Sequence, residues 1–209
     1  AYQALGRYRQ AIEDFNRAIA IKADFPEAYN NRGNAYQALG NYRQAMEDIN
    51  KAVEIKPDYA TAYNSRGNVF QSLGDYHQAI KDYNRAIGHK PRYAEAFYNR
   101  GTAYNKLGNY QLAIADLSRA IDFRPDYPEA FVNRGFAYKG LENYREAIKD
   151  YSSAIRIKPD YTFAYLNRSA VYVKVENHDM AVKDLKMAAK LGDENARKLL
   201  RGKGISWQQ

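Results

Sequence analysis

Apolar and small side chains recur along this chain at helical spacing, in pairs of segments separated by short polar breaks. Between residues 26 and 59 the first segment carries Tyr29, Gly33, Tyr36 and Leu39. The dipeptide Gly40-Asn41 interrupts the pattern, and a second amphipathic stripe then runs from Tyr42 to Val53. Spacings of three and four residues predict one face of an α-helix, and Gly-Asn is typical of a turn. This stretch therefore predicts two helices joined by a tight turn.

The same pattern returns at one constant interval along the chain. Prolines take one slot of the period, at Pro57, Pro91, Pro125 and Pro159. Small residues take another, at Gly33, Gly67, Gly101, Gly135 and Ser169, and alanines a third, at Ala45, Ala79, Ala113, Ala147 and Ala181. A fixed period of this size indicates a repeat array, in which no unit buries its apolar stripe alone and neighbouring units must stack.

These residues resemble the tetratricopeptide repeat. In the stretch 26–59 the matching residues are Tyr29, Gly33, Tyr36, Ala45, Ile49 and Pro57. The resemblance covers nearly the whole chain and implies an all-α fold, a right-handed α-α superhelix (solenoid) of helix-turn-helix units. The implied organisation is an incomplete leading repeat at 1–25, full repeats at 26–59, 60–93, 94–127, 128–161 and 162–192, and a capping helix with a tail at 193–209. In the capping helix we expect Ala196, Leu199 and Leu200 to face inward.

One departure from the family recurs in step with the period, because an arginine stands before the glycine where the family usually has leucine. The arginines are Arg32, Arg66, Arg100, Arg134 and Arg168, and each is followed at one constant separation by an aspartate, at Asp48, Asp82, Asp116, Asp150 and Asp184. A guanidinium binds a carboxylate through two parallel hydrogen bonds. We therefore predict a structural ion pair between the two helices of each repeat. The alternative is a row of arginines that captures acidic ligands.

Composition and motifs argue against several classes of function. The chain is 45% hydrophobic and 14% aromatic, too much for a disordered chain. No apolar run approaches the roughly 18 residues that span a bilayer. The chain has no cysteine, and its histidines, His77, His89 and His178, lack metal-ligand spacing. Catalytic and nucleotide-binding motifs are not found. We expect no enzyme activity, no cofactor and no metal. The sequence does not identify a compartment, although we favour a soluble cytoplasmic protein.

The 20 tyrosines and the net charge of +8 raise the question of nucleic-acid binding, since aromatic and basic side chains together can stack bases. However, nineteen of the tyrosines fall in slots that serve helix packing, and only Tyr98 lies outside them. The charge permits an acidic partner without requiring one. Nucleic acid is therefore disfavoured as a partner.

In this family the first helix of each repeat lines a concave groove that binds peptides. One groove slot here holds Asn31, Asn99, Asn133 and Asn167, with Ser65 as the exception, and the first two full repeats add Asn30, Asn34, Asn64 and Asn68. An asparagine amide offers a donor and an acceptor, so it can pair with a peptide backbone. The ladder resembles the repeat array of the O-linked N-acetylglucosamine transferases, which grips extended chains by their backbones. The alternative is that these asparagines only keep the surface hydrated.

The later repeats carry apolar residues in the slots of Asn30 and Asn34. These are Tyr98 with Thr102, Val132 with Phe136, and Leu166 with Ala170, and Phe163 and Val173 extend the patch. Apolar side chains in outward-facing slots mark an interaction site. We predict that this half of the groove anchors apolar side chains of a ligand. The alternative is that the chain's own C-terminal segment covers the patch.

The predicted function is a scaffold that binds a peptide or a segment of a partner protein in its groove. One alternative is the interaction module of a larger enzyme, such as a glycosyltransferase, whose catalytic domain lies outside these residues. Another is a self-assembling scaffold. The leading repeat leaves the stripe Tyr8, Ile12 and Phe15 partly uncovered. We expect the chain to be a fragment of a longer array, with self-association through this N-terminal edge.

Overall fold

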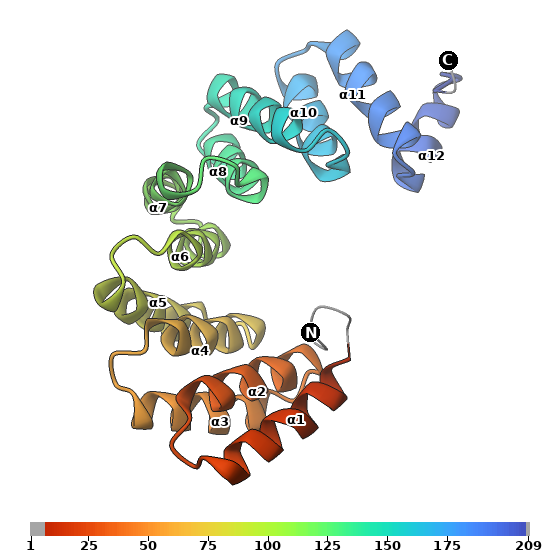
Figure 1. Ribbon diagram of the computed structural model, residues 1–209. Helices are drawn as coiled ribbons and strands as arrows, with labels where there is room; N and C mark the ends of the chain where they lie inside the picture. Colours follow the sequence, from red (N-terminus) through yellow and green to blue (C-terminus); the bar gives the residue numbers. More distant parts are fainter. Residues whose placement is uncertain (1–6, 208–209) are drawn as a thin grey trace. The chain divides into compact units, whose positions relative to one another are not determined.

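The computed structural model describes residues 7–207, which form twelve helices and no strand (Figure 1). The helices are α1 (Tyr8–Ile21), α2 (Pro26–Ala38), α3 (Tyr42–Ile55), α4 (Ala60–Ser72), α5 (Tyr76–His89), α6 (Ala94–Lys106), α7 (Tyr110–Phe123), α8 (Pro128–Gly140), α9 (Tyr144–Ile157), α10 (Thr162–Lys174), α11 (His178–Lys190) and α12 (Glu194–Gly202). The all-α fold predicted from the sequence is confirmed. Tyr2 and Gly6, which the sequence assigns to the leading repeat, lie outside the described residues.

The even-numbered helices α2, α4, α6, α8 and α10 begin where the predicted repeats begin, and we call them A helices. The helices α1, α3, α5, α7, α9 and α11 are the B helices. The turn from an A helix to a B helix uses a left-handed residue, such as Gly40 with φ of 77°. Glycine adopts this conformation without steric cost. In the last two turns Glu142 and Glu176 take the same conformation, with φ of 60° and 59°.

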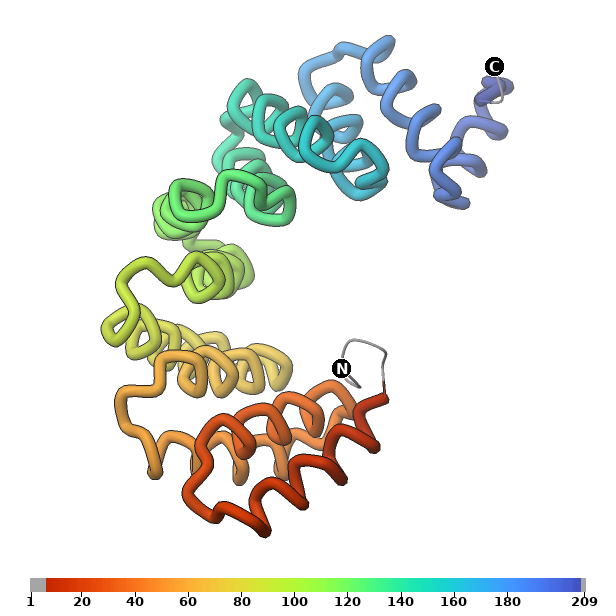
Figure 2. Tube along the Cα trace, viewed as in Figure 1, coloured from red at the N-terminus to blue at the C-terminus, as the bar shows by residue number. Residues whose placement is uncertain are grey.

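The described residues divide into two compact units, unit 1 up to residue 103 and unit 2 from residue 104. In unit 1, α2 packs against α3 and α4 against α5, while α1 contacts α2 and α3 contacts α4. In unit 2 the pairs α8–α9 and α10–α11 pack in the same way, joined by contacts of α7 with α8 and of α9 with α10. Within each unit the chain passes from one helix to its neighbour (Figure 2). Each unit is therefore a stretch of α-solenoid.

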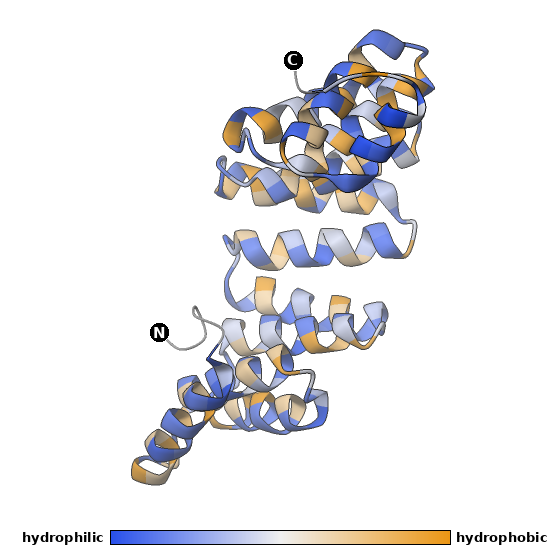
Figure 3. Ribbon diagram, turned by 90° about the vertical axis from the view of Figure 1, so that its right-hand side faces the viewer, coloured by the Kyte–Doolittle hydropathy of each residue, from blue (hydrophilic) through white to orange (hydrophobic). Residues whose placement is uncertain are grey.

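Neighbouring A helices also touch each other directly, as α2 does with α4 in unit 1 and α8 with α10 in unit 2. Their solvent-facing side is called the A-helix surface of its unit below. Hydrophobic and hydrophilic residues alternate along the helices (Figure 3). This alternation fits a thin core that each helix contacts along one stripe.

The core is built from small side chains on the B helices and larger ones beside glycines of the A helices. Ala45, Ala79, Ala113 and Ala147 are fully buried. Tyr83 and Tyr151 are fully buried as well, and their rings lie against Gly67 and Gly135. None of the tyrosines within residues 7–207 is a largely exposed side chain. The tyrosines therefore serve packing, because their rings fill the space between helices that small residues bring close together.

The helix α12 covers the end of unit 2. Its first turn is capped by the Asp193 carboxylate, which accepts from the Ala196 amide at 2.6 Å. Ala196 and Leu200 are buried against a cluster that contains Tyr165, and Ile205, Trp207 and Leu166 pack on the same cluster. The expectation that Leu199 faces inward is wrong, because this side chain is 49% exposed. A nine-residue helix presents too narrow a buried stripe to cover all three side chains.

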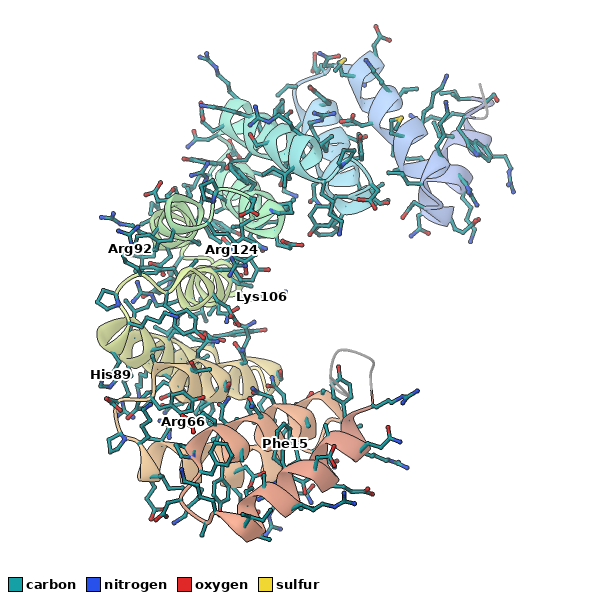
Figure 4. The ribbon with its side chains drawn as sticks, viewed as in Figure 1. Phe15, Arg66, His89, Arg92, Lys106 and Arg124 are labelled. Atoms are coloured by element: carbon teal, nitrogen blue, oxygen red, sulfur yellow. The ribbon has the colours of Figure 1, made fainter. Side chains whose placement is uncertain are left out.

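The helix α1 stands at the other end of the described chain. Its Tyr8, Ile12 and Phe15 are partly buried, and Phe15 is labelled in Figure 4. Ile21, at the end of α1, is 88% exposed. Self-association through this edge stays a prediction.

The close approach of α4 to α5 can be tested with Gly67→Ala. A Cβ atom at Gly67 would lie 2.5 Å from Cε1 of the buried Tyr83 ring. Overpacking of this kind costs about 1–3 kcal/mol, so we expect the urea midpoint of the variant to fall. Gly88→Ala is the matched control on α5, because a Cβ there meets nothing within 4 Å. That variant should gain up to about 1 kcal/mol from helix propensity. Equal losses in both variants would contradict the packing argument.

Candidate functional site

Arginine and aspartate pairs join the two helices of a repeat in both units. Arg32 Nε donates to Asp48 Oδ2 at 2.7 Å, and its Nη2 donates to Asp48 Oδ1 at 2.5 Å. The same two bonds recur at 2.7–2.8 Å in the pairs Arg66–Asp82, Arg134–Asp150 and Arg168–Asp184. Hydrogen bonding to Asp82 raises the pKa of Arg66, so this guanidinium stays charged. These four arginines are occupied by the protein itself, which leaves little of them for an acidic ligand.

The third nitrogen of each arginine reaches the preceding B helix, a contact that the sequence argument missed. Arg66 Nη1 donates to Asn50 Oδ1 at 2.8 Å, and Arg134 Nη1 donates to Ser118 Oγ at 2.9 Å. The residues in this role are Asn16, Asn50, Asn84, Ser118 and Ser152. These polar residues recur once in each repeat, and this recurrence is the sequence pattern that could have predicted the contact. Where both contacts form, one guanidinium links its own A helix to two B helices, so it stabilises the stacking of repeats as well as each repeat.

In unit 1 the asparagines of the predicted ladder bind mainly to the protein. Asn30, Asn64 and Asn99 are buried, with 1%, 2% and 9% exposure. Asn99 Nδ2 donates to Asn64 Oδ1 at 3.0 Å, and Asn64 Nδ2 donates to Glu95 Oε1 at 3.3 Å. Asn68 Oδ1 accepts from the Tyr83 hydroxyl at 2.8 Å. Asn64 and Asn99 join neighbouring A helices, and Asn68 is held by the B helix of its own repeat, so these three amides are already engaged by the protein. Asn30 is buried on α2, and its Oδ1 has no partner within the described residues.

The remaining predicted residues of unit 1 lie partly exposed on the A-helix surface. They are Asn31, Asn34, Tyr98 and Thr102. Thr102 donates its hydroxyl to the Tyr98 carbonyl at 2.9 Å, and Asn31 accepts from Asn30 Nδ2 at 3.4 Å. Asn34 makes no hydrogen bond to another residue within 7–207 through its side chain. Asn34 therefore remains a candidate for binding a ligand backbone.

The asparagines of unit 2 donate to backbone carbonyls. Asn133 Nδ2 bonds to the Glu129 carbonyl at 2.9 Å, and Asn167 Nδ2 bonds to the Phe163 carbonyl at 2.8 Å, each one turn earlier in its own helix. Asn105 Nδ2 bonds to the Asn133 carbonyl at 2.9 Å. The NH2 group of an asparagine has two N–H donors, and each of these bonds uses one of them. Each bond therefore reduces, without exhausting, the hydrogen-bonding capacity that these amides can offer a ligand.

The residues of the predicted apolar patch differ in their exposure to solvent. Val132 is only 2% exposed and packs in the core with Tyr151, so the expectation that it anchors a ligand is corrected. The same cluster contains Ala164 and Val171 of the neighbouring A helix α10. By contrast, Phe136 and Phe163 are 38% and 56% exposed. Leu166 is partly exposed and packs on the cluster that α12 covers, so the C-terminal segment reaches part of the patch.

Two tyrosines at equivalent positions of their repeats differ in the hydrogen bonding of their buried hydroxyl groups. The Tyr83 hydroxyl donates to Asn68 Oδ1 at 2.8 Å and lies 3.4 Å from Gln71 Oε1. Tyr151 occupies the same slot of its repeat, yet its hydroxyl has no partner within the described residues. Burial raises the pKa of both phenols, so both remain protonated donors. The spacing along the sequence indicates packing for both tyrosines and does not reveal this difference between their hydroxyl groups.

The histidines within residues 7–207 do not form a candidate metal site. His77, His89 and His178 are exposed and far apart in the sequence, and no group of three potential metal ligands occurs there. The His89 ring stacks on Tyr63 with centroids 5.5 Å apart. None of the described helices is long and apolar enough to cross a membrane.

Comparisons with known proteins point to one repeat family. A model described as tetratricopeptide repeat matches residues 64–128, and a second one with this description matches 26–59 and 128–161. A model described as TPR repeat matches residues 1–40. No curated protein sequence matches the chain.

Solved structures share the fold. YrrB, whose crystal structure is described as a TPR protein with an unusual peptide-binding site, is 25% identical with a TM-score of 0.71, and the match covers 93% of this chain and 100% of YrrB. PilF of Pseudomonas aeruginosa is 25% identical with a TM-score of 0.77, covering 84% of this chain and 80% of PilF. PilW, a type IV pilus biogenesis factor, is 22% identical with a TM-score of 0.85, covering 95% and 93%.

The buried ion pair can be tested with Arg66→Ala, Asp82→Ala and the double variant. Removing Arg66 leaves the Asp82 carboxylate buried and without its two hydrogen bonds, which should cost about 3–5 kcal/mol of unfolding free energy. The double variant should lose less than the sum of the single losses, because neither charge is left alone. Glu47→Ala is the control for an exposed pair, since its Arg43 partner is 93% exposed, and it should change stability by less than about 1 kcal/mol.

The two tyrosine hydroxyls should respond differently to removal. Tyr83→Phe loses a hydrogen bond, so protection of α5 amides from hydrogen exchange should fall by about 1 kcal/mol. Tyr151→Phe removes a donor that has no partner, so protection of α9 amides should stay the same or rise. Equal losses at both sites would mean that Tyr151 has a partner in solution.

Proposed function

Because this chain belongs to the tetratricopeptide repeat family, we propose that it is a protein-interaction module whose A-helix surface in unit 2 receives an extended segment of a partner protein. Binding, rather than catalysis, is the role that fits the side chains of this surface. YrrB is described as having a peptide-binding site, and its likeness in fold supports the same class of ligand here.

The observation that carries the proposal is the exposure of large apolar side chains on the neighbouring A helices α8 and α10. Phe136 on α8 is 38% exposed and Phe163 on α10 is 56% exposed. Val173, near the end of α10, is 50% exposed. The helices that bear them contact each other. Exposed aromatic side chains on adjacent elements of one surface are typical of a binding site.

Magnitudes indicate what such a surface contributes. Burying a whole phenylalanine side chain is worth about 1.5–3 kcal/mol. The exposed parts of Phe136 and Phe163 together amount to about one side chain, so covering both should give about 1.5–3 kcal/mol. Each hydrogen bond to the ligand backbone adds about 1 kcal/mol. Micromolar affinity requires about 8 kcal/mol, so the two aromatic anchors act together with polar contacts along the segment.

On the A-helix surface of unit 1 we propose a separate contact, in which Asn34 pairs with the backbone of a ligand. The Asn34 side chain is partly exposed and hydrogen-bonds to no other described residue. By contrast, Asn64 and Asn99 already bond to each other. Replacing Asn34 therefore tests ligand binding, whereas replacing Asn99 also removes a contact between A helices.

A binding experiment with the double variant Phe136→Ser, Phe163→Ser tests the proposal. Partners captured by the wild-type chain are identified by mass spectrometry, and the affinity for one purified partner is then measured. We expect the double variant to bind this partner at least about 30-fold more weakly, which is the loss of roughly 2 kcal/mol.

Leu112→Ser is the matched control. Leu112 lies on the B helix α7 of the same unit and is 51% exposed, so its replacement removes a similar apolar area from a different surface. The control variant should bind like the wild type. Unchanged affinity in the double variant, with its helical content intact, would rule out these anchors.

A further inference from the structure

A pocket of about 240 Å³ lies in unit 1 where α3, α4 and α5 meet. Met46 of α3 and Phe70 of α4 line it, and both side chains are partly buried. Lys81 and Arg85 of α5 line it as well, and both are exposed, so the pocket opens to solvent beside them. Sites for drug-sized ligands measure about 300–1,000 Å³. This pocket is smaller, and its size suits one large side chain of a partner.

The charged groups of the pocket do not balance. Arg66, which is labelled in Figure 4, binds Asp82 through two hydrogen bonds, so these two charges offset each other. Arg85 Nη1 lies 3.9 Å from Asp82 Oδ1, an oxygen that Arg66 already uses. Lys81 forms no ion pair with a carboxylate of residues 7–207. Among the described residues that line the pocket, the three cations Arg66, Lys81 and Arg85 therefore face the single carboxylate of Asp82, and two positive charges are left over.

The two surplus cations are neighbours on one face of α5. Lys81 and Arg85 are four residues apart, which places their side chains one helical turn from each other. Tyr63 helps to position Arg85, because the guanidinium carbon lies 5.7 Å from the centroid of the tyrosine ring. Like charges at this spacing repel each other, and an anion bound between them would remove the repulsion. A phosphate monoester fits this charge, since it carries about −1.5 to −2 at neutral pH.

The pair of cations is specific to α5 among the described B helices. In each of the others, at least one of the two slots holds an acidic or uncharged residue, and the pairs are Glu13 and Arg17, Glu47 and Lys51, Ala115 and Arg119, Lys149 and Ser153, and Lys183 and Met187. The stacking of repeats therefore does not require two cations at these slots. This leaves them available for another role.

The apolar residues of the pocket depart from the repeat pattern too. The slot of Met46 otherwise holds a β-branched residue, at Ile12, Ile80, Ile114, Ile148 and Val182. The slot of Phe70 otherwise holds a tyrosine within the described residues, at Tyr36, Tyr104, Tyr138 and Tyr172. Methionine is unbranched and adapts to the shape of a neighbour, and a phenyl ring has no hydroxyl that needs a partner. These two departures give an apolar surface beside the two cations.

We propose that this pocket binds the phosphorylated ring of a phosphotyrosine side chain on a partner protein. The ring lies against Met46 and Phe70, while the phosphate oxygens accept hydrogen bonds from Lys81 Nζ and the Arg85 guanidinium. Guanidinium and ammonium groups both bind phosphate through charge-assisted hydrogen bonds. A dianion matches the surplus of two positive charges, whereas a carboxylate would balance only one. The inference goes beyond the proposed function, because it adds a contact on another unit that involves neither aromatic anchor of unit 2.

Phenyl phosphate titrated into the labelled chain and followed by NMR tests the pocket. We expect shifts of α3 and α5 amides and a Kd of about 1 mM or tighter, which two charge-assisted hydrogen bonds and a covered ring can supply. Methyl phosphate lacks the ring, and phenyl sulfate has the ring with a single negative charge. Each should bind at least about fivefold more weakly than phenyl phosphate.

A pair of peptides identifies the source of the phosphate. The first is acetyl-Gly-Ser-phosphoTyr-Ser-Gly-amide, and the second is the same peptide without the phosphate. The phosphopeptide should bind at least as tightly as phenyl phosphate, because its backbone adds contacts at the rim of the pocket. The unmodified peptide should bind at least about tenfold more weakly, since it makes no charge-assisted hydrogen bond.

Variants of the two cations test their role. Lys81→Gln and Arg85→Gln should each weaken the binding of phenyl phosphate by about fivefold or more. Both side chains are exposed, so the helical content should stay unchanged. Arg43→Gln is the charge-matched control, because Arg43 lies on α3 outside the pocket, with a side chain that is 93% exposed and paired with Glu47. This control should bind phenyl phosphate like the wild type.

The outcomes separate this inference from the proposed function. An absence of shifts at millimolar phenyl phosphate, equal affinity for methyl phosphate or phenyl sulfate, or binding that persists in the Lys81→Gln, Arg85→Gln double variant overturns the pocket. A phosphopeptide that fails to bind while phenyl phosphate binds overturns a protein as the source. None of these results changes the expectation for Phe136→Ser, Phe163→Ser, because those residues belong to unit 2.

Discussion

The stacking of the repeats depends on a recurring arginine side chain that bonds to two B helices. The arginine before the small residue of an A helix binds an aspartate of its own B helix through two bonds, and its remaining nitrogen reaches the preceding B helix. A planar group with fixed donor directions can make these contacts only when the three helices hold one relative arrangement. The ion pair therefore determines the relative arrangement of the helices more than it increases the net free energy of unfolding, because desolvation offsets much of its Coulomb energy.

The thin core explains why so few side chains remain for binding. A helix in a stack of repeats is covered by neighbours on several sides, so its small and aromatic residues are used in packing. The asparagines on the A helices follow the same logic, since Asn64 and Asn99 join adjacent helices and Asn133 and Asn167 bond to their own helix backbones. Polar residues that resemble a ligand-binding ladder in the sequence thus form hydrogen bonds within the protein itself.

We therefore expect a ligand to bind at positions where the residues differ from one repeat to the next. Slots that every repeat fills alike maintain the stack, whereas Phe136, Lys139 and Tyr151 depart from the arrangement of Asn68, Gln71 and Tyr83. The departure leaves exposed aromatic surface and unpaired donors at one place. The unsatisfied Tyr151 hydroxyl costs the free protein some stability.

The sequence by itself determined the helices, their pairing and the place of the small residues, because a constant repeat period and helical spacing are local properties that each repeat restates. It also placed each arginine at one constant separation from an aspartate, as Arg32 is from Asp48. Only the tertiary structure decided which polar groups remain available. Whether Asn30 or Val132 is buried, or whether Tyr151 finds an acceptor, depends on side chains from other helices, and spacing along the chain does not contain that information. Burial and hydrogen-bond satisfaction are properties of the packed helices together.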